Sequence, residues 1–209
     1  MGIQERKERE KERRRQQIIV AAKRVFSNKG FNKATMEDIA KESELSPGTL
    51  YLYFKNKEEL YASLSLRILY FQNIRVEQVI AEVDADPISK LKQLMNAMFD
   101  VYEFDPLVII NMFQLQSSET LKNLSEELLS EIKTINHQVL NNVASIFSEG
   151  VEKGIFVDKH PFALADIFLS TFGGVVLWET SKTAIDQKKD FLKPTLHLAF
   201  ELFLKGIKK

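Results

Sequence analysis

The stretch TMEDIAKESELSPGTLYLYFKNKEEL, residues 35–60, decides the fold because two helix-start signals follow each other closely in it. Thr35 is a preferred N-cap residue and Asp38 completes a capping box, which predicts a helix over 36–43. Ser46 is a second N-cap, and Pro47 in the first turn loses no needed N–H group, which predicts a helix over 47–54. Two short helices joined by a short turn form a helix-turn-helix.

The second of these helices suits the major groove of DNA. That groove is about 12 Å wide and admits one helix, whose N-terminal residues face the base edges. Ser46, Pro47, Gly48 and Thr49 make a small tip, and Gly48 allows the backbone to approach DNA closely. The sequence therefore predicts specific DNA binding. The alternative is a nonspecific, architectural DNA-binding protein, with a steep salt dependence and little sequence preference.

With AAKRVFSNKGFNKAT (21–35) before it, this stretch resembles the DNA-binding region of the TetR/AcrR family of transcriptional regulators over about residues 15–62. The resemblance implies a ligand-responsive regulator, usually a repressor, and carries over a set of DNA contacts. By resemblance, Thr35, Tyr53 and Lys57 contact phosphates, Thr49 and Tyr51 reach bases or adjacent backbone, and Ser46, Pro47 and Gly48 line the tip. The alternative for Tyr51 and Tyr53 is aromatic packing between helices.

The turn departs from the family pattern. The family commonly has Ala-Gly-Val there, whereas this chain has Ser43-Glu44-Leu45. If the turn geometry is kept, Glu44 takes a positive φ, at a cost of about 1 kcal/mol or more relative to glycine.

Helical periodicity and capping signals continue to the end of the chain, and strand alternation is absent. We predict an all-α fold with a helix-turn-helix domain at 1–60 and a helical effector-binding and dimerisation domain at 61–209. The expected helices, beside those above, cover 14–29, a segment from Lys57, and 87–104, 106–116, 119–153, 161–183 and 190–206. Gly30 and Gly154 are expected to end the helices before them.

The charge is uneven although the net charge is zero. Residues 1–60 contain 14 Lys and Arg against 10 Asp and Glu, so +4, and residues 61–209 carry −4. The run Glu5–Arg15 contains no apolar residue. It is interpreted as a solvated helix extension or frayed tail, with a DNA-contacting basic arm as the alternative.

Several classes of protein are disfavoured. The absence of cysteine excludes disulfides and thiolate sites, and the N-terminus shows no secretory signal. The longest uncharged apolar run, Ile167–Trp178, is short for a membrane span and is interpreted as a buried core helix. His137, His160 and His197 have no metal-ligand spacing, and no hydrolase, P-loop or dinucleotide motif occurs, so neither enzyme activity nor a cofactor is expected. The expected location is the cytoplasm.

The C-terminal region is rich in methionine and aromatic residues, which suits an apolar ligand, although ordinary core packing explains the same pattern. The predicted ligand-binding residues are Met98, Phe99, Tyr102, Asn111, Met112, Phe147, Phe172 and Trp178. The expected inducer is a small lipophilic molecule, such as a fatty acyl compound or a drug-like amphiphile.

The expected macromolecular partners are double-stranded DNA, as a palindromic operator, and a second copy of the chain. The family pairs its last two long helices across a two-fold axis, and 161–183 and 190–206 are the matching segments. Apolar residues recur there at helical spacing, although packing within one chain explains much of this pattern: Leu164, Phe168, Phe172, Val176, Leu196, Phe200 and Phe203.

Overall fold

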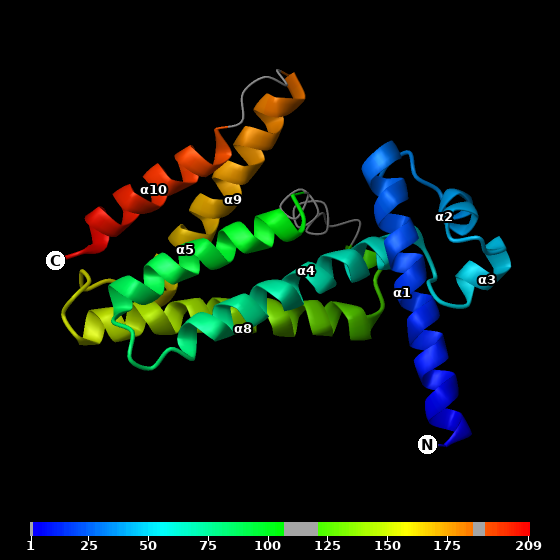
Figure 1. Cartoon of the computed structure of the whole chain (residues 1–209), viewed down its shortest axis with the longest axis horizontal. Helices are drawn as coiled ribbons and strands as arrows, with labels where there is room; N and C mark the ends of the chain where they lie inside the picture. Colours follow the sequence, from blue (N-terminus) through cyan, green and yellow to red (C-terminus); the bar gives the residue numbers. More distant parts are fainter. Residues whose placement is uncertain (1, 107–120, 186–190) are drawn as a thin grey trace. The chain divides into compact units, whose positions relative to one another are not determined.

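The structure, a computed structural model, describes residues 2–106, 121–185 and 191–209, and within them it confirms the predicted all-α fold (Figure 1). Within these residues the helices are α1 (Ile3–Lys29), α2 (Met36–Glu42), α3 (Pro47–Tyr51), α4 (Lys57–Ile80), α5 (Pro87–Phe104), α8 (Glu126–Glu152), α9 (Pro161–Ile185) and α10 (Leu192–Ile207). Apart from residue 106, the helix expected over 106–116 lies outside the described residues.

The local start signals act as predicted. The Thr35 hydroxyl accepts a hydrogen bond from the Asp38 N–H at 3.1 Å, and the Asp38 carboxylate accepts from the Thr35 N–H at 3.2 Å. Lys29, 2.6 Å from Asp38, holds the pKa of that carboxyl below its usual value. The Ser46 hydroxyl caps α3 by accepting from the Thr49 N–H at 3.1 Å. Each cap satisfies an N–H group that a helix start leaves without a partner.

Three helix limits differ from expectation. α1 begins at Ile3, so the charged run continues the helix instead of forming a frayed tail. α3 ends at Tyr51 instead of residue 54. α8 begins at Glu126 instead of residue 119, because Ser125 supplies the cap by accepting from the Leu128 N–H at 3.4 Å.

Contacts divide the chain into two units, each with its own core. The first contains the described parts of Met1–Arg67 and Gln114–Ser130, and the second those of Ile68–Phe113 and Glu131–Lys209. The predicted domain limits, 1–60 and 61–209, stay a prediction. In the first unit, α1 packs against α2 and α2 against α3. Ile18, Ile39 and Leu50, one from each helix, are fully buried in this core.

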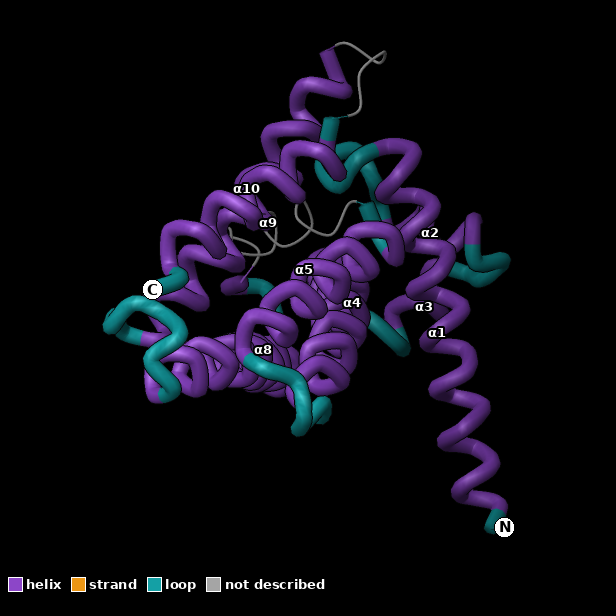
Figure 2. The backbone as a smooth tube through the Cα atoms, turned by 60° about the vertical axis from the view of Figure 1, so that its left-hand side comes forward, coloured by secondary structure: helices purple, strands orange, loops and turns teal. Residues whose placement is uncertain are grey.

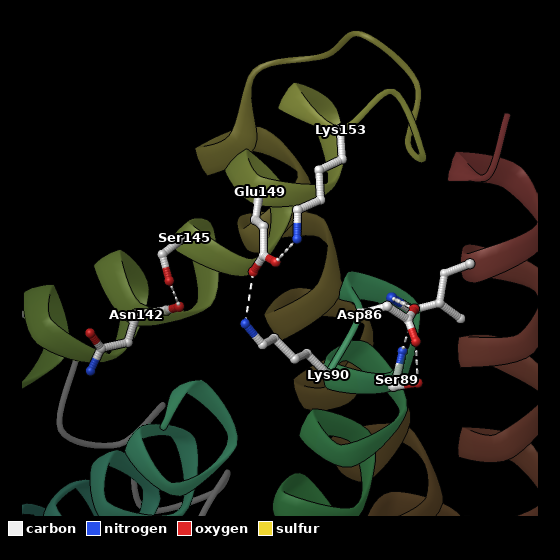
Figure 3. Close-up of polar contacts among 8 residues, drawn as sticks. Asp86, Ser89, Lys90, Asn142, Ser145, Glu149 and Lys153 are labelled. Atoms are coloured by element: carbon white, nitrogen blue, oxygen red, sulfur yellow. Dashed lines mark hydrogen bonds and ion pairs between the residues drawn. The ribbon is translucent and has the colours of Figure 1, made fainter. Parts of the chain in front are cut away.

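In the second unit, α5, α8 and residues 68–80 of α4 lie side by side, as do α9 and α10 (Figures 1 and 2). A buried ion pair ties α5 to α8: the Lys90 ammonium lies 2.8 Å from the Glu149 carboxylate (Figure 3). Lys153, at 2.6 Å, and Lys90 together hold the pKa of Glu149 below its usual value, so that carboxyl stays ionised.

The chain end is paired with the α8–α9 connection. The Val157 N–H donates to the Ile207 carbonyl at 2.7 Å, and the Lys209 N–H donates to the Ile155 carbonyl at 3.0 Å. Phe156, between them, is fully buried and fills the space above Gly150, where an added Cβ would lie 2.0 Å from the ring. Gly150 is therefore required by packing.

The apolar helix α9 is less buried than expected. Its segment Pro161–Lys182 is long and apolar enough, by length and composition, to cross a membrane, and 28% of its most apolar window is buried. The interpretation of Ile167–Trp178 as a buried core helix is thus wrong for part of its surface, because Ile167, Leu177 and Trp178 are exposed.

Candidate nucleic-acid interface and ligand-binding residues

The tip of α3 is a small, preordered surface. Ser46, Pro47 and Gly48 are exposed, and the Ser46 hydroxyl lies 2.9 Å from the Thr49 hydroxyl as well as capping the helix. A Cβ added to Gly48 would meet only Ser46 Oγ, at 3.9 Å, so no packing within the chain requires glycine there.

The turn before α3 carries the expected strain. Glu44 has a φ of 55°, which confirms the left-handed conformation expected at this position. The Leu45 N–H closes the turn by donating to the Ala40 carbonyl at 2.9 Å.

The two tyrosines of the α3 region lie in different environments. Tyr51 is 49% exposed, whereas Tyr53 is half-buried and packs against the core of the first unit. The exposed ring is free to meet DNA, and the packing alternative describes Tyr53 better. Thr35 is exposed, with its hydroxyl engaged in the α2 cap.

Lys57 has a structural role that the sequence did not indicate. Its ammonium donates to the carbonyls of Phe31, Asn32 and Ala34 at 3.1, 3.4 and 3.3 Å, and lies 4.7 Å from the centre of the Phe31 ring. It thereby fastens the α1–α2 loop to the start of α4. A phosphate contact by Lys57 stays a prediction, and its removal would disturb this loop as well.

Arg15 was missed because it stands at the end of the charged run. Its guanidinium lies 4.3 Å from the centre of the Phe54 ring and donates to Ser63 Oγ at 3.1 Å and the Tyr53 carbonyl at 3.5 Å. The available signal was its spacing: Arg15 precedes Ile18 and Ile19 by three and four residues, on the apolar stripe of α1. It positions the segment that follows α3.

Most of the predicted ligand-binding residues that the structure describes come together. Met98, Phe99, Phe147 and Phe172 are buried in the core of the second unit, and Tyr102 packs against it. Trp178 does not join them, since it is 65% exposed. Asn111 and Met112 lie outside the described residues. The ligand-binding role of this set stays a prediction.

Comparisons with known proteins agree with this geometry. The family described as "Bacterial regulatory proteins, tetR family" matches residues 18–64. The "Fatty acid metabolism regulator protein" of Bacillus subtilis is 31% identical over 192 residues, which cover 91% of this chain and 94% of that protein.

Two solved structures are similar along nearly the whole chain. The fatty acid degradation regulator FadR of Bacillus halodurans is 28% identical with a TM-score of 0.73, covering 92% of this chain and 95% of that one. FadR of Bacillus subtilis in complex with stearoyl-CoA is 28% identical with a TM-score of 0.68, covering 92% and 98%. Proteins of this kind are transcriptional regulators and not enzymes.

Proposed function

Since the chain belongs to the TetR family of transcriptional regulators, we propose that it is a homodimeric repressor that leaves a palindromic operator when it binds a long-chain acyl inducer. The observation that carries the DNA-binding part is the tip of α3, which is capped, small and exposed. The aromatic core of the second unit and the acyl-CoA bound to a 28% identical relative support the choice of inducer.

The proposed contacts with DNA come from the exposed residues of the helix-turn-helix. Ser46 to Thr49 present the tip of α3 to the base edges, and Tyr51 and Thr35 flank it. Capping fixes these groups before DNA arrives, so less conformational entropy is lost on binding.

The proposed dimer forms through α9 and α10. Residues predicted from sequence for this interface, such as Phe168, Val176 and Phe200, are buried within the protomer and stabilise its own core. A second set of large apolar side chains faces outward from the same two helices: Phe162, Ile167, Leu177, Trp178, Leu198 and Leu202.

The outward face of α9 has a helical repeat. Ile167, Gly174 and Trp178 follow at seven and four residues, and a Cβ added to Gly174 meets nothing within 4 Å. A second copy of this helix could approach closely there. A two-fold dimer also matches the symmetry of a palindromic operator.

The proposed switch uses α4. This helix is continuous from Lys57 in the first unit to Ile80 in the second. A ligand that prefers one position of residues 68–80 therefore shifts the equilibrium between DNA-binding and DNA-released states, typically by about 1–3 kcal/mol of coupling.

Selection of bound sequences from a random duplex library at near-physiological salt tests the DNA-binding part. We expect a palindromic consensus, and about tenfold weaker binding by Tyr51→Ala, because the lost contact is worth roughly 1–3 kcal/mol. Val83→Ala, at an 86% exposed valine in the α4–α5 connection, is the control and should bind normally. Failure to enrich any sequence would favour the nonspecific alternative.

Sedimentation velocity tests the dimer. Trp178→Glu places a charge on the outward face of α9 and should yield monomers at concentrations where the unaltered protein is dimeric. Val83→Glu, at an 86% exposed valine in the α4–α5 connection, should leave the dimer intact. A dimer that survives Trp178→Glu would contradict the assigned interface.

A further inference from the structure

Gln72 breaks the apolar stripe of α4. Ile68, Val76 and Val79, which share that stripe, are buried in the core of the second unit. Gln72 lies between them and is itself only 7% exposed. An amide is expensive to bury among apolar side chains unless strong hydrogen bonds compensate for its lost hydration.

The described partner of this amide is weak. Its Nε2 donates to the thioether of Met98 on α5, at 3.7 Å. A thioether sulfur is a poor acceptor compared with a carbonyl or carboxylate oxygen. Met98 is fully buried and belongs to the set predicted to bind ligand.

Two other buried polar side chains of this unit, Lys90 and Asn73, make stronger contacts. Lys90 pairs with Glu149 at 2.8 Å. The neighbouring Asn73 donates to the Glu77 carboxylate at 2.7 Å and accepts from the Asn142 amide at 3.2 Å. Gln72 thus differs from its neighbours in having an amide N–H directed at sulfur within an otherwise apolar core.

We infer that Gln72 is the polar anchor of the inducer site and that its amide N–H donates to the acyl carbonyl oxygen of the bound molecule. The inference rests on the proposed function, in which the inducer is an intact acyl compound with both its chain and its head group. When the inducer enters, the carbonyl oxygen replaces the Met98 sulfur as acceptor, and the hydrocarbon chain lies among the surrounding apolar side chains.

The charges around this core favour a neutral carbonyl over a carboxylate. A buried carboxylate needs a cation nearby. Three basic side chains of α4, α5 and α10 already contact acids: Arg75 pairs with Asp100, Lys90 with Glu149, and Lys193 with Glu103. A thioester or ester carbonyl accepts a hydrogen bond without requiring one of these pairs to open.

The inference makes Gln72 a specificity-determining residue. Recognition of a carbonyl by a buried donor discriminates strongly against a ligand that lacks the oxygen, because the donor then remains unsatisfied. A purely apolar site would accept both ligands alike.

The test combines a change in the protein with a change in the ligand. The two probes are stearoyl-CoA and S-octadecyl-CoA, a thioether of the same chain length without the carbonyl. Each is titrated into the full-length protein bound to its operator, and the concentration for half release is measured. The variant is Gln72→Met, which keeps an unbranched side chain of similar length, and the control is Leu94→Met, at a fully buried leucine of α5.

We expect the unaltered protein and Leu94→Met to prefer stearoyl-CoA over the thioether by about tenfold, the effect of one buried hydrogen bond. Gln72→Met should respond to both probes at similar concentrations, each measured relative to the operator affinity of the same variant. The coupling between the two changes isolates the single contact.

Two results would overturn the inference, and they differ. The anchor is rejected if the preference for stearoyl-CoA persists in Gln72→Met. It is also rejected if the unaltered protein shows no preference although both probes release DNA. Either result leaves the acyl inducer in place. Release by neither probe from the unaltered protein rejects the acyl inducer itself and the anchor with it.

Discussion

Gly48→Ala should have opposite effects on folding and on DNA binding. The added methyl group has ordinary room, since its nearest neighbour would be Ser46 Oγ at 3.9 Å, and the position has no positive φ. Alanine is favoured over glycine within a helix by roughly 0.5–1 kcal/mol. For a chain of this size that corresponds to a rise of about 1–4 °C in the thermal midpoint.

The same methyl group would stand on the surface that we propose approaches DNA. Overpacking a close interface costs typically about 1–3 kcal/mol, which weakens operator binding by roughly 5- to 150-fold. The assays are thermal denaturation at a fixed protein concentration and titration of a labelled operator duplex. Gly206→Ala is the matched control, because this glycine of α10 also has open space around its Cβ position.

The outcome pattern decides between explanations. Gly206→Ala should raise the midpoint and leave operator binding unchanged. If Gly48→Ala is more stable and binds the operator normally, close approach is not the reason for this glycine and the assignment of the α3 tip fails. If Gly48→Ala is less stable, the reasoning about its open surroundings is wrong.

Three further predictions concern stability. Gly150→Ala should destabilise the protein by several kcal/mol, because its Cβ would overlap the buried Phe156 ring at 2.0 Å, and Gly150→Ala combined with Phe156→Leu should recover part of the loss in urea denaturation. Glu44→Gly should raise stability by up to about 1 kcal/mol by relieving a φ of 55°, and a decrease in the urea midpoint would contradict this. Lys90→Met should lower stability at neutral pH by about 1–3 kcal/mol by removing a buried partner of Glu149. The pKa of Glu149 is depressed in the folded protein, so its contribution is present above the unfolded value of 4.5 and is lost as pH falls through the folded pKa. The deficit of Lys90→Met should therefore shrink in acid, and a constant deficit from neutral pH to below the folded pKa would contradict the role of the ion pair.

The sequence predicted the features that depend on a few neighbouring residues. The caps at Thr35 and Ser46 act over three residues, and the strain at Glu44 follows from the turn around it, so their outcomes could be deduced locally. The start of α8 was not deduced, because the sequence-based segment was taken as one helix from 119, whereas α8 begins at Glu126, directly after the Ser125 cap.

Features that depend on distant segments were missed. The position of Arg15 over Phe54 and the contacts of Lys57 with the α1–α2 loop join residues more than twenty positions apart, and no local pattern specifies them. For Trp178, periodicity identified an apolar helix but could not assign its faces, because α9 is apolar on nearly every side.

The pairing of the chain end with the α8–α9 connection has a mechanical consequence. Helix ends commonly fray, but at the C-terminal end of α10 the Lys209 N–H donates to the Ile155 carbonyl and the Val157 N–H to the Ile207 carbonyl. These two hydrogen bonds join the two ends of the segment 155–209. If the proposed dimer contacts on α10 form, a displacement of that helix is expected to reach the end of α8 through these two hydrogen bonds.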